Sequence, residues 1–238
     1  NQAPVAGWST PYVYVLLIIG VLLIAGFFVI EFRFAEHPLI PFHAFSRDVS
    51  FVLGCVACGW GAFGTWIWYF WRFQIEYRHT SPLLGSAEFV PAAPVAIVAC
   101  FVTGLLIARV RPGWIMVMSM TAFTLGNILT AIAPVHQTYW ALTFVCLLVI
   151  PWGMDMSFPA ATLMLSNSVE RKHQGIAASL VTTVVNYSIS LSLGFAGTVE
   201  VHVNNGGKTP EEVLRGYRGA LYFATGLGAL GIVLSVVF

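Results

Sequence analysis

Seven long apolar segments constrain the fold of this chain of 238 residues more than any other feature. Each has about twenty residues or more, which is the length that an α-helix needs to cross the hydrocarbon core of a bilayer. The segments cover 12–31, 49–71, 83–108, 113–133, 138–164, 174–199 and 217–238. Only 9% of the residues are charged, whereas a soluble domain carries about 25%. The sequence therefore predicts an all-α, polytopic transmembrane helical bundle of about seven spanning helices.

Composition argues against several functional classes. The formal net charge is +1, so no strongly basic surface indicates nucleic-acid binding. Cys55 and Cys58 form a CxxC within an apolar segment, and without a nearby His or second CxxC they favour helix packing over metal binding. The sequence contains no HExxH, GxSxG or Walker A pattern. We therefore expect no enzymatic activity, no metal site and no cofactor.

The connections between the apolar segments predict a topology. Segment 32–48 mixes aromatic and charged residues with two prolines, which is typical of an amphipathic strip on the membrane surface. Six Arg or Lys residues lie in the first, third and fifth connections and five in the others, so the count alone is nearly balanced. The compact basic turns 109–112 and 170–173 both belong to the first set, which favours a cytoplasmic location for it. We therefore place the N-terminus and the outer loops 72–82, 134–137 and 200–216 on the opposite side.

The strongest candidate for function is Asp155, within the fifth segment and between Pro151 and Pro159. A carboxylate at bilayer depth costs about 2.5–3.5 kcal/mol on insertion scales. The two prolines bend the helix and free backbone carbonyls. Asp155 is then either a protonatable or cation-binding group that faces a cavity, or a structural residue that braces the bend. Trp152, one turn earlier, and Met156 would supply apolar contacts beside it.

Four further residues are candidates for the same pathway. In the sixth segment Asn186 and Tyr187 lie among small and polar residues that recur every fourth position, a pattern equally typical of helix packing. Trp60 is deep enough to line a pathway, whereas Trp66, Trp68 and Trp71 indicate an interface belt. Glu88 either faces the pathway or is a solvated or Arg72-paired residue near the outer interface, and Glu200 is expected to be exposed. The small and polar residues of the sixth segment are Thr182, Asn186, Ser190, Gly194 and Thr198.

Three stretches resemble parts of one transporter family. Gly104 to Arg109 and Arg111 resemble the loop motif G-x-x-x-D-R-x-G-R-R of the major facilitator superfamily, although the Asp is missing here. The stretch that begins with Gln174-Gly175 and continues through Asn186-Tyr187 to Gly194 and Gly197 looks like the penultimate helix of fungal 14-helix drug:proton antiporters. Within that group the aminotriazole-resistance and boron-efflux type is the most similar. Residues 1–8 and 37–41 resemble its linker helix and the exit from it.

The resemblance implies a domain organisation and a function. A linker helix over 1–31 and the amphipathic connection over 32–48 would precede the six-helix C-terminal bundle over 49–238, and we expect the chain to be cut at both ends. The implied function is efflux of small polar or amphipathic compounds, coupled to protons and completed by an N-terminal half. The implied partners are the lipid bilayer, the substrate and protons, and we expect the plasma membrane rather than the vacuolar membrane. The alternatives are a seven-helix receptor and an inactive transporter half.

Overall fold

The structure is a computed structural model that describes residues 10–34, 47–169 and 174–237. The chain divides into two compact units, Asn1–Ser46 and Arg47–Phe238. In the first unit, helix α2 covers Pro11–Arg33, with a proline in its first turn and Arg33 in its last, as helix ends prefer. Its large apolar side chains are exposed all round within this unit, which suits a helix surrounded by lipid. Most of the expected amphipathic connection 32–48 lies outside the described residues.

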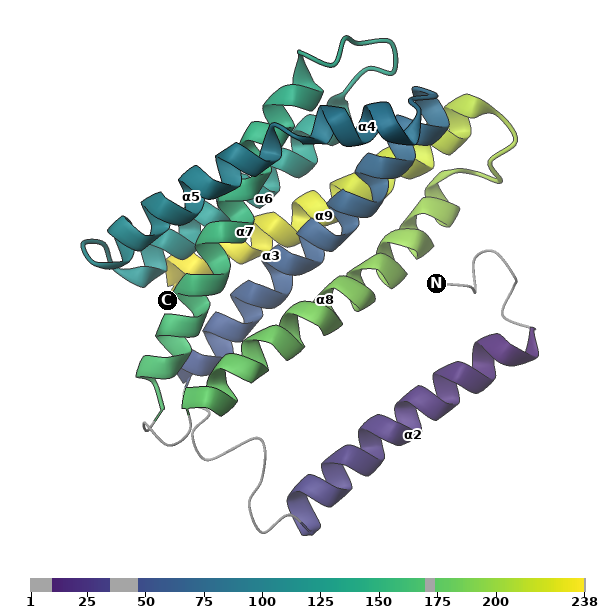
Figure 1. Ribbon diagram of the computed structural model, residues 1–238. Helices are drawn as coiled ribbons and strands as arrows, with labels where there is room; N and C mark the ends of the chain where they lie inside the picture. Colours follow the sequence, from purple (N-terminus) through teal and green to yellow (C-terminus); the bar gives the residue numbers. More distant parts are fainter. Residues whose placement is uncertain (1–9, 35–46, 170–173, 238) are drawn as a thin grey trace. The chain divides into compact units, whose positions relative to one another are not determined.

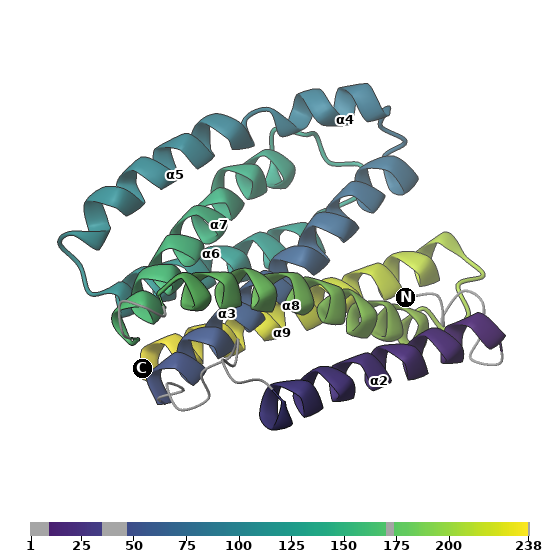
Figure 2. The same ribbon diagram turned by 60° about the horizontal axis from the view of Figure 1, so that its bottom comes forward.

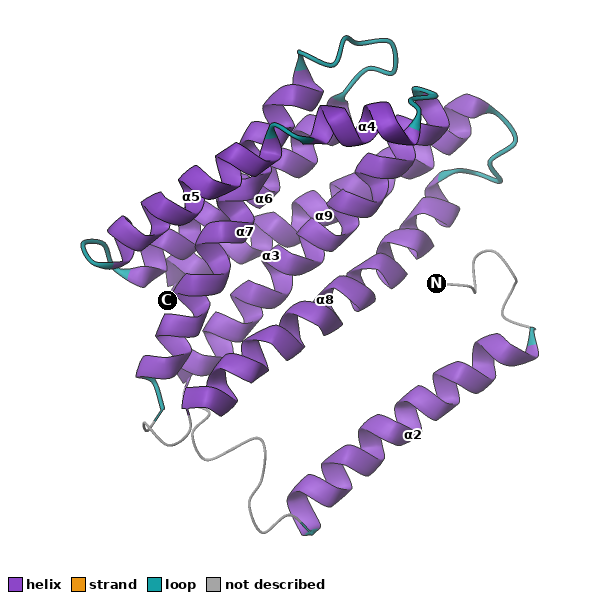
Figure 3. Ribbon diagram, in the orientation of Figure 1, coloured by secondary structure: helices purple, strands orange, loops and turns teal. Residues whose placement is uncertain are grey.

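The described part of the second unit is helical, and Figure 3 shows no strand in it. Two pairs of elements each form one span, because η2 continues α3 and because α4 precedes α5 within one apolar stretch. With α2, this gives seven helices long and apolar enough to cross a membrane, so the all-α prediction is confirmed. The elements of the second unit are α3 (Arg47–Arg72), η2 (Phe73–Tyr77), α4 (Pro82–Phe89), α5 (Ala92–Ile107), α6 (Pro112–Ile132), α7 (Leu142–Asn167), α8 (Gln174–Val203) and α9 (Pro210–Val237).

Helix α3 is central to the second unit, because it contacts α6, α7, α8 and α9. Helix α6 packs against α7 and α9, and α5 packs against α7 (Figures 1 and 2). Three connections meet at one end, which we call the Arg72 end: residues 78–81, 133–141 and 204–209. The other end, which we call the Arg111 end, holds the 108–111 turn and the C-terminal turns of α7 and α9.

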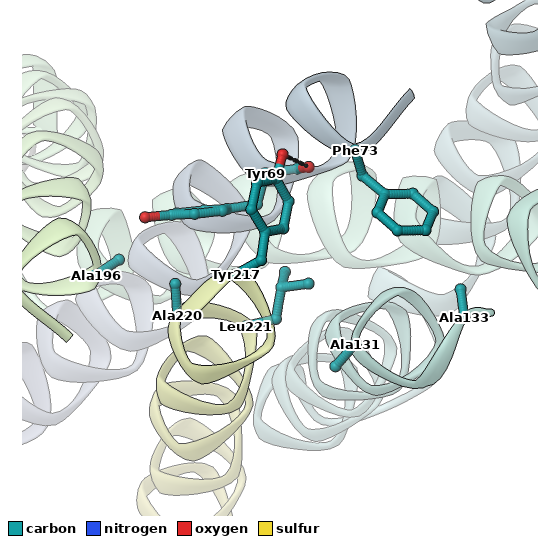
Figure 4. Packing of buried hydrophobic residues seen from close by; sticks show 8 residues of the cluster. All are labelled: Tyr69, Phe73, Ala131, Ala133, Ala196, Tyr217, Ala220 and Leu221. Carbon is teal, nitrogen blue, oxygen red and sulfur yellow. Dashed lines mark hydrogen bonds between the residues drawn. The ribbon is translucent and has the colours of Figure 1, made fainter. Parts of the chain in front are cut away.

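Aromatic packing closes the Arg72 end. The rings of Tyr69 and Tyr217 meet edge to face with centroids 4.9 Å apart. The Tyr217 hydroxyl donates a 3.0 Å hydrogen bond to the Tyr69 carbonyl, drawn as a dashed line in Figure 4. Small residues let α6, α8 and α9 pack closely around this pair. The buried cluster comprises Tyr69, Phe73, Ala131, Ala133, Ala196, Tyr217, Ala220 and Leu221.

One expected boundary is wrong, for a local reason. The 200–216 loop is much shorter, because α8 continues to Val203 and α9 already begins at Pro210. Thr209 and Glu212 form a capping box, in which Glu212 Oε2 accepts from the amides of residues 208 and 209 and Thr209 Oγ1 accepts from the Glu212 amide. Such a box starts a helix among polar residues, and a hydropathy argument does not detect it.

The third apolar segment, expected as one span over 83–108, is one span, and it contains two helices with a break at Val90 and Pro91. A proline carries no amide to continue the ladder of hydrogen bonds. Helix α7, in contrast, continues through both Pro151 and Pro159. Whether a proline ends a helix or stays within one thus differs between two spans of the same chain.

Candidate functional site

Asp155 carries an unpartnered oxygen within the span formed by α7. The residue is half-buried, and its Oδ2 atom is buried without a hydrogen-bond partner among the described residues. In a regular helix the Asp155 carbonyl would accept from the amide of residue 159. Residue 159 is proline, so this carbonyl also loses its usual donor. Two acceptor oxygens at one residue therefore lack their normal partners in an apolar helix.

Trp60 of α3 packs against the turn of α7 that follows Asp155. Its ring meets Phe158 edge to face with centroids 6.4 Å apart, and Phe123 of α6 in the same manner at 6.2 Å. The Trp60 Nε1 atom is buried and has no acceptor within the described part of the chain. A second unsatisfied polar atom thus lies where α3, α6 and α7 meet.

The other α7 candidates face different environments. Met156 is 1% exposed and belongs to the packed interior, whereas Trp152 is half-buried. Because neighbouring helical positions point about 100° apart, Asp155 and Met156 cannot both face the same opening. The structure therefore puts Trp152, rather than Met156, among the more accessible residues near Asp155.

Asn186 and Tyr187 lie on an exposed face of α8, and 57% of the Tyr187 surface is accessible. The buried face of α8 consists of other residues, and Ser192 on that face lies 2.7 Å from Thr65 Oγ1. The recurring small and polar residues thus do not pack against helices of this unit. Their hydroxyls bond to carbonyls of α8 itself, as Ser190 does to Asn186 and Thr198 does to Gly194.

Glu88 belongs to the Arg72 end rather than to the surroundings of Asp155. Its carboxylate accepts a 3.0 Å hydrogen bond from Gln74, and its carbonyl accepts one of 2.6 Å from Tyr139. Arg72 instead pairs with Glu76 and Glu200, each at 3.0 Å. The pairing of Glu88 with Arg72, one of the alternatives for this residue, is therefore wrong.

The expectation that Glu200 is exposed is also wrong, because only 14% of its side chain is accessible. The Tyr69 hydroxyl donates to Glu200 at 2.6 Å. Trp66, expected in the interface belt, is fully buried and donates to Thr130 at 2.9 Å. Glu200 and Trp66 are both buried by partners that lie far away in the sequence, Tyr69 and Thr130.

Two polar residues missed by the sequence argument lie in the connections of the Arg72 end. Arg78 donates to Thr143 and to the carbonyl of Pro134. Burial lowers the pKa of Arg78, and the charge of Glu88 partly opposes this shift. Burial raises the pKa of Tyr139, and Glu88 adds to that shift. Arg78, Tyr139 and Glu88 form this polar cluster. The density of polar residues in and beside the 72–82 connection is the sequence pattern that could have indicated it.

The motif residues lie mainly at the Arg111 end. Gly104, Arg109 and Arg111 are exposed, and no carboxylate of the described residues pairs with either arginine. Gln174, beside the exposed Gly175, donates to the carbonyl of Ser166 and so joins the start of α8 to the end of α7. Farther along α8, Gly194 and Gly197 are half-buried. Within the described residues, no three His, Cys, Asp or Glu side chains gather as metal ligands.

Seven apolar spans and an unpartnered carboxylate oxygen within one of them define a multi-pass α-helical membrane protein. Comparison with protein-family models gives no match. Over its whole length the chain is 55% identical to a low affinity ammonium transporter of Saccharomyces cerevisiae and 38% identical to the aminotriazole resistance protein of that yeast. It is 42% identical to a major facilitator superfamily multidrug transporter, mdr3, of Aspergillus fumigatus.

The chain belongs to the major facilitator superfamily. It spans 45%, 44% and 38% of the lengths of these three relatives, respectively. This coverage is consistent with the expected C-terminal half. The receptor alternative is not favoured, because two of these relatives are named as transporters and the third as a resistance protein.

Proposed function

We propose that this chain forms one half of a transporter that exports small polar or amphipathic compounds in exchange for protons. The observation that carries the proposal is the buried Asp155 Oδ2 atom, which has no hydrogen-bond partner among the residues that the structure describes. Intramembrane acids are costly and usually mark a substrate or proton pathway. Relatives named as ammonium and multidrug transporters support transport as the class of function.

In the proposed cycle Asp155 alternates between two protonation states. Low dielectric surroundings favour the neutral acid, so release of its proton requires a cation or water at the carboxylate. The Asp155 carbonyl, freed by Pro159, provides a second acceptor for that cation or water. Trp60 and Trp152 would contribute apolar contacts, with Met156 packed behind them. A proton and a substrate would therefore bind at the Asp155 carboxylate in turn, at different stages of the transport cycle.

The second half of the transporter would provide the opposite wall. Many transporters of this superfamily are built from two bundles that rock about a site near the bilayer midplane. The exposed Asn186 and Tyr187 of α8 would donate and accept hydrogen bonds from the cavity, and Glu88 would act nearer its outer mouth. Residues 1–31 and 32–48 would serve as the linker helix and its amphipathic connection to the bundle over 49–238. We infer a non-enzymatic protein of the plasma membrane.

Transport of ammonium or a small amine is a second candidate. A buried carboxylate oxygen without a donor among the described residues suits a small cation that carries several N–H groups. A relative that is 55% identical is named as a low affinity ammonium transporter. This candidate differs from proton-coupled export in the species that neutralises Asp155.

The test is Asp155→Asn in the full-length transporter, with Glu211→Gln, at an exposed acid of α9, as the control. Asparagine retains the shape and hydrogen bonding but cannot exchange a proton. We expect normal delivery to the membrane, loss of proton-dependent export and little effect of the control. Wild-type export by Asp155→Asn would remove Asp155 from the mechanism, whereas loss of the folded protein would indicate the structural role. Methylammonium uptake that depends on Asp155 but not on a proton gradient would favour the second candidate.

A further inference from the structure

A cavity of about 550 Å³ opens at the Arg111 end, away from Asp155. It lies between the first turns of α6 and the C-terminal turns of α7 and α9. Its volume falls within the range of about 300–1,000 Å³ that is typical of small-molecule sites. Arg111 and Trp114 contribute from the α6 side, Met164, Asn167 and Ser168 from α7, and Val236 from α9.

The polar part of this cavity has unused hydrogen-bond donors. Arg111 is exposed and has no ion pair or hydrogen bond to its side chain within the described residues. Its guanidinium therefore keeps all five N–H donors. The exposed Asn167 likewise uses none of its amide donors in the part of the chain that the structure describes. Among the described residues, no acidic side chain lines the cavity, so the net charge of this lining favours an anion.

Helix α6 adds to this preference. Arg111 is its N-cap residue, Pro112 follows at the first helical position, and no side chain caps the first turn. The helix continues for 21 residues, so its positive dipole end lies beside Arg111. The Trp114 amide of this turn already donates to the Arg111 carbonyl. Guanidinium groups bind phosphate through paired hydrogen bonds. Together these groups suit a phosphate or a phosphodiester.

The apolar part of the cavity continues along the span. Val117 and Met164 line it on the bilayer side of Arg111, and Pro112–Ile132 is one of the seven apolar spans. Trp114 lies on the same turn and is 61% exposed, in the manner of tryptophans at membrane interfaces. A cationic mouth followed by an apolar wall matches an amphiphile better than a free anion.

We propose that this cavity binds the headgroup of an anionic phospholipid. The phosphate contacts Arg111 and the Asn167 amide. The glycerol and the first part of an acyl chain lie against Trp114, Val117 and Met164. Basic pockets between transmembrane helices bind such headgroups in other membrane proteins. The inference does not depend on the transported substrate or on Asp155.

Native mass spectrometry of the protein, purified at its natural full length, tests this proposal. The probes are palmitoyl-oleoyl phosphatidylserine and the phosphatidylcholine with the same chains. We expect selective retention of phosphatidylserine and a loss of about fivefold in its retention for Arg111→Gln, the usual effect of one basic residue. Arg109→Gln is the matched control, because Arg109 is exposed in the same turn but does not line the cavity.

Three outcomes would overturn the proposal. Equal retention of phosphatidylcholine would show that the headgroup charge does not matter. An equal effect of Arg109→Gln would indicate diffuse attraction to the surface, and complete competition by glycerophosphate would indicate a site for a soluble anion. If Arg111→Gln does not fold, Val117→Trp, which fills the apolar wall, serves as the second variant. Unchanged phosphatidylserine retention by a folded Val117→Trp would equally refute the lipid site.

Discussion

Arg72 and Glu200 are separated by 128 positions in the chain, yet Arg72 Nη1 lies 3.0 Å from Glu200 Oε1. The pair joins α3 to α8 at the Arg72 end. The Arg72 guanidinium also lies 5.1 Å from the centre of the Tyr217 ring, a favourable cation–π distance. Tyr69 completes the set through its hydrogen bond to Glu200. One cation thus links three helices.

Glu200→Gln should destabilise the bundle by about 1–3 kcal/mol, less than the 3–5 kcal/mol of a fully buried pair. The reduction follows from the partial exposure of Arg72, whose side chain is 28% accessible. The midpoint of unfolding in sodium dodecyl sulfate measures the effect. Glu76→Gln is the control, because Glu76 also pairs with Arg72 but is 46% exposed, and it should cost about 0.3–0.5 kcal/mol. Equal effects of the two variants would contradict the bridging role of Glu200.

Thr130→Val should cost about 1–3 kcal/mol, because it leaves a buried donor unsatisfied. The donor is Trp66 Nε1, which lies 2.9 Å from Thr130 Oγ1 in a fully buried position. Thr121→Val is the matched control on the same helix, since Thr121 is half-buried and bonds only to the Val117 carbonyl. The same unfolding assay compares them, and similar losses would argue against the Trp66 bond as the cause.

Close helix contact predicts opposite effects for two glycines of α9. A Cβ atom at Gly216 would lie 2.7 Å from the Glu200 carbonyl oxygen, which is backbone and cannot turn aside. Gly216→Ala should therefore separate α8 from α9 and cost about 1–3 kcal/mol. Gly226 has nothing within 4 Å of the same position, so Gly226→Ala should stabilise the helix by about 0.5–1 kcal/mol. Neutral effects of both variants in the unfolding assay would contradict the close approach of α8 to α9 at Gly216.

The number and position of the spans follow from the sequence, because bilayer thickness fixes the length of an apolar helix. The ends of helices were less predictable. The first two turns of α9 contain Glu211, Glu212 and Arg215, which hydropathy assigns to a loop although they are helical.

Side-chain partners were the least predictable feature of the candidate site. Hydropathy placed Asp155 and Trp60 within their spans, but it did not show that Met156 and Trp66 face the packed interior. Contacts such as Arg72 with Glu200 join helices that are far apart in the chain. They depend on helix rotation and packing, about which residue type alone carries little information.

The predicted topology can be tested by cysteine labelling. In a protein without its four native cysteines, Lys208→Cys should react with an impermeant maleimide added outside intact cells. Arg109→Cys should react only after permeabilisation, because the basic 108–111 turn is expected in the cytoplasm. Both positions are exposed, so access does not differ for local reasons. The reverse labelling pattern would show that every span has the opposite orientation in the membrane.

Residues 1–238 alone should show no saturable, proton-dependent flux in liposomes, because one bundle forms only one wall of a cavity between two halves. Circular dichroism of the same preparation confirms that the helices are present. Adding the other half as a separate chain is expected to restore flux. Flux by 1–238 alone would contradict this expectation and would direct attention to homodimers.

The exposed hydroxyls of α8 have a consequence for movement. Since Ser190 and Thr198 bond to carbonyls of their own helix, they need no bond from whatever lies opposite. Such a surface can exchange water, lipid or protein neighbours without breaking hydrogen bonds at each exchange. This face of α8 can therefore move past a neighbouring helix without having to break hydrogen bonds between the two.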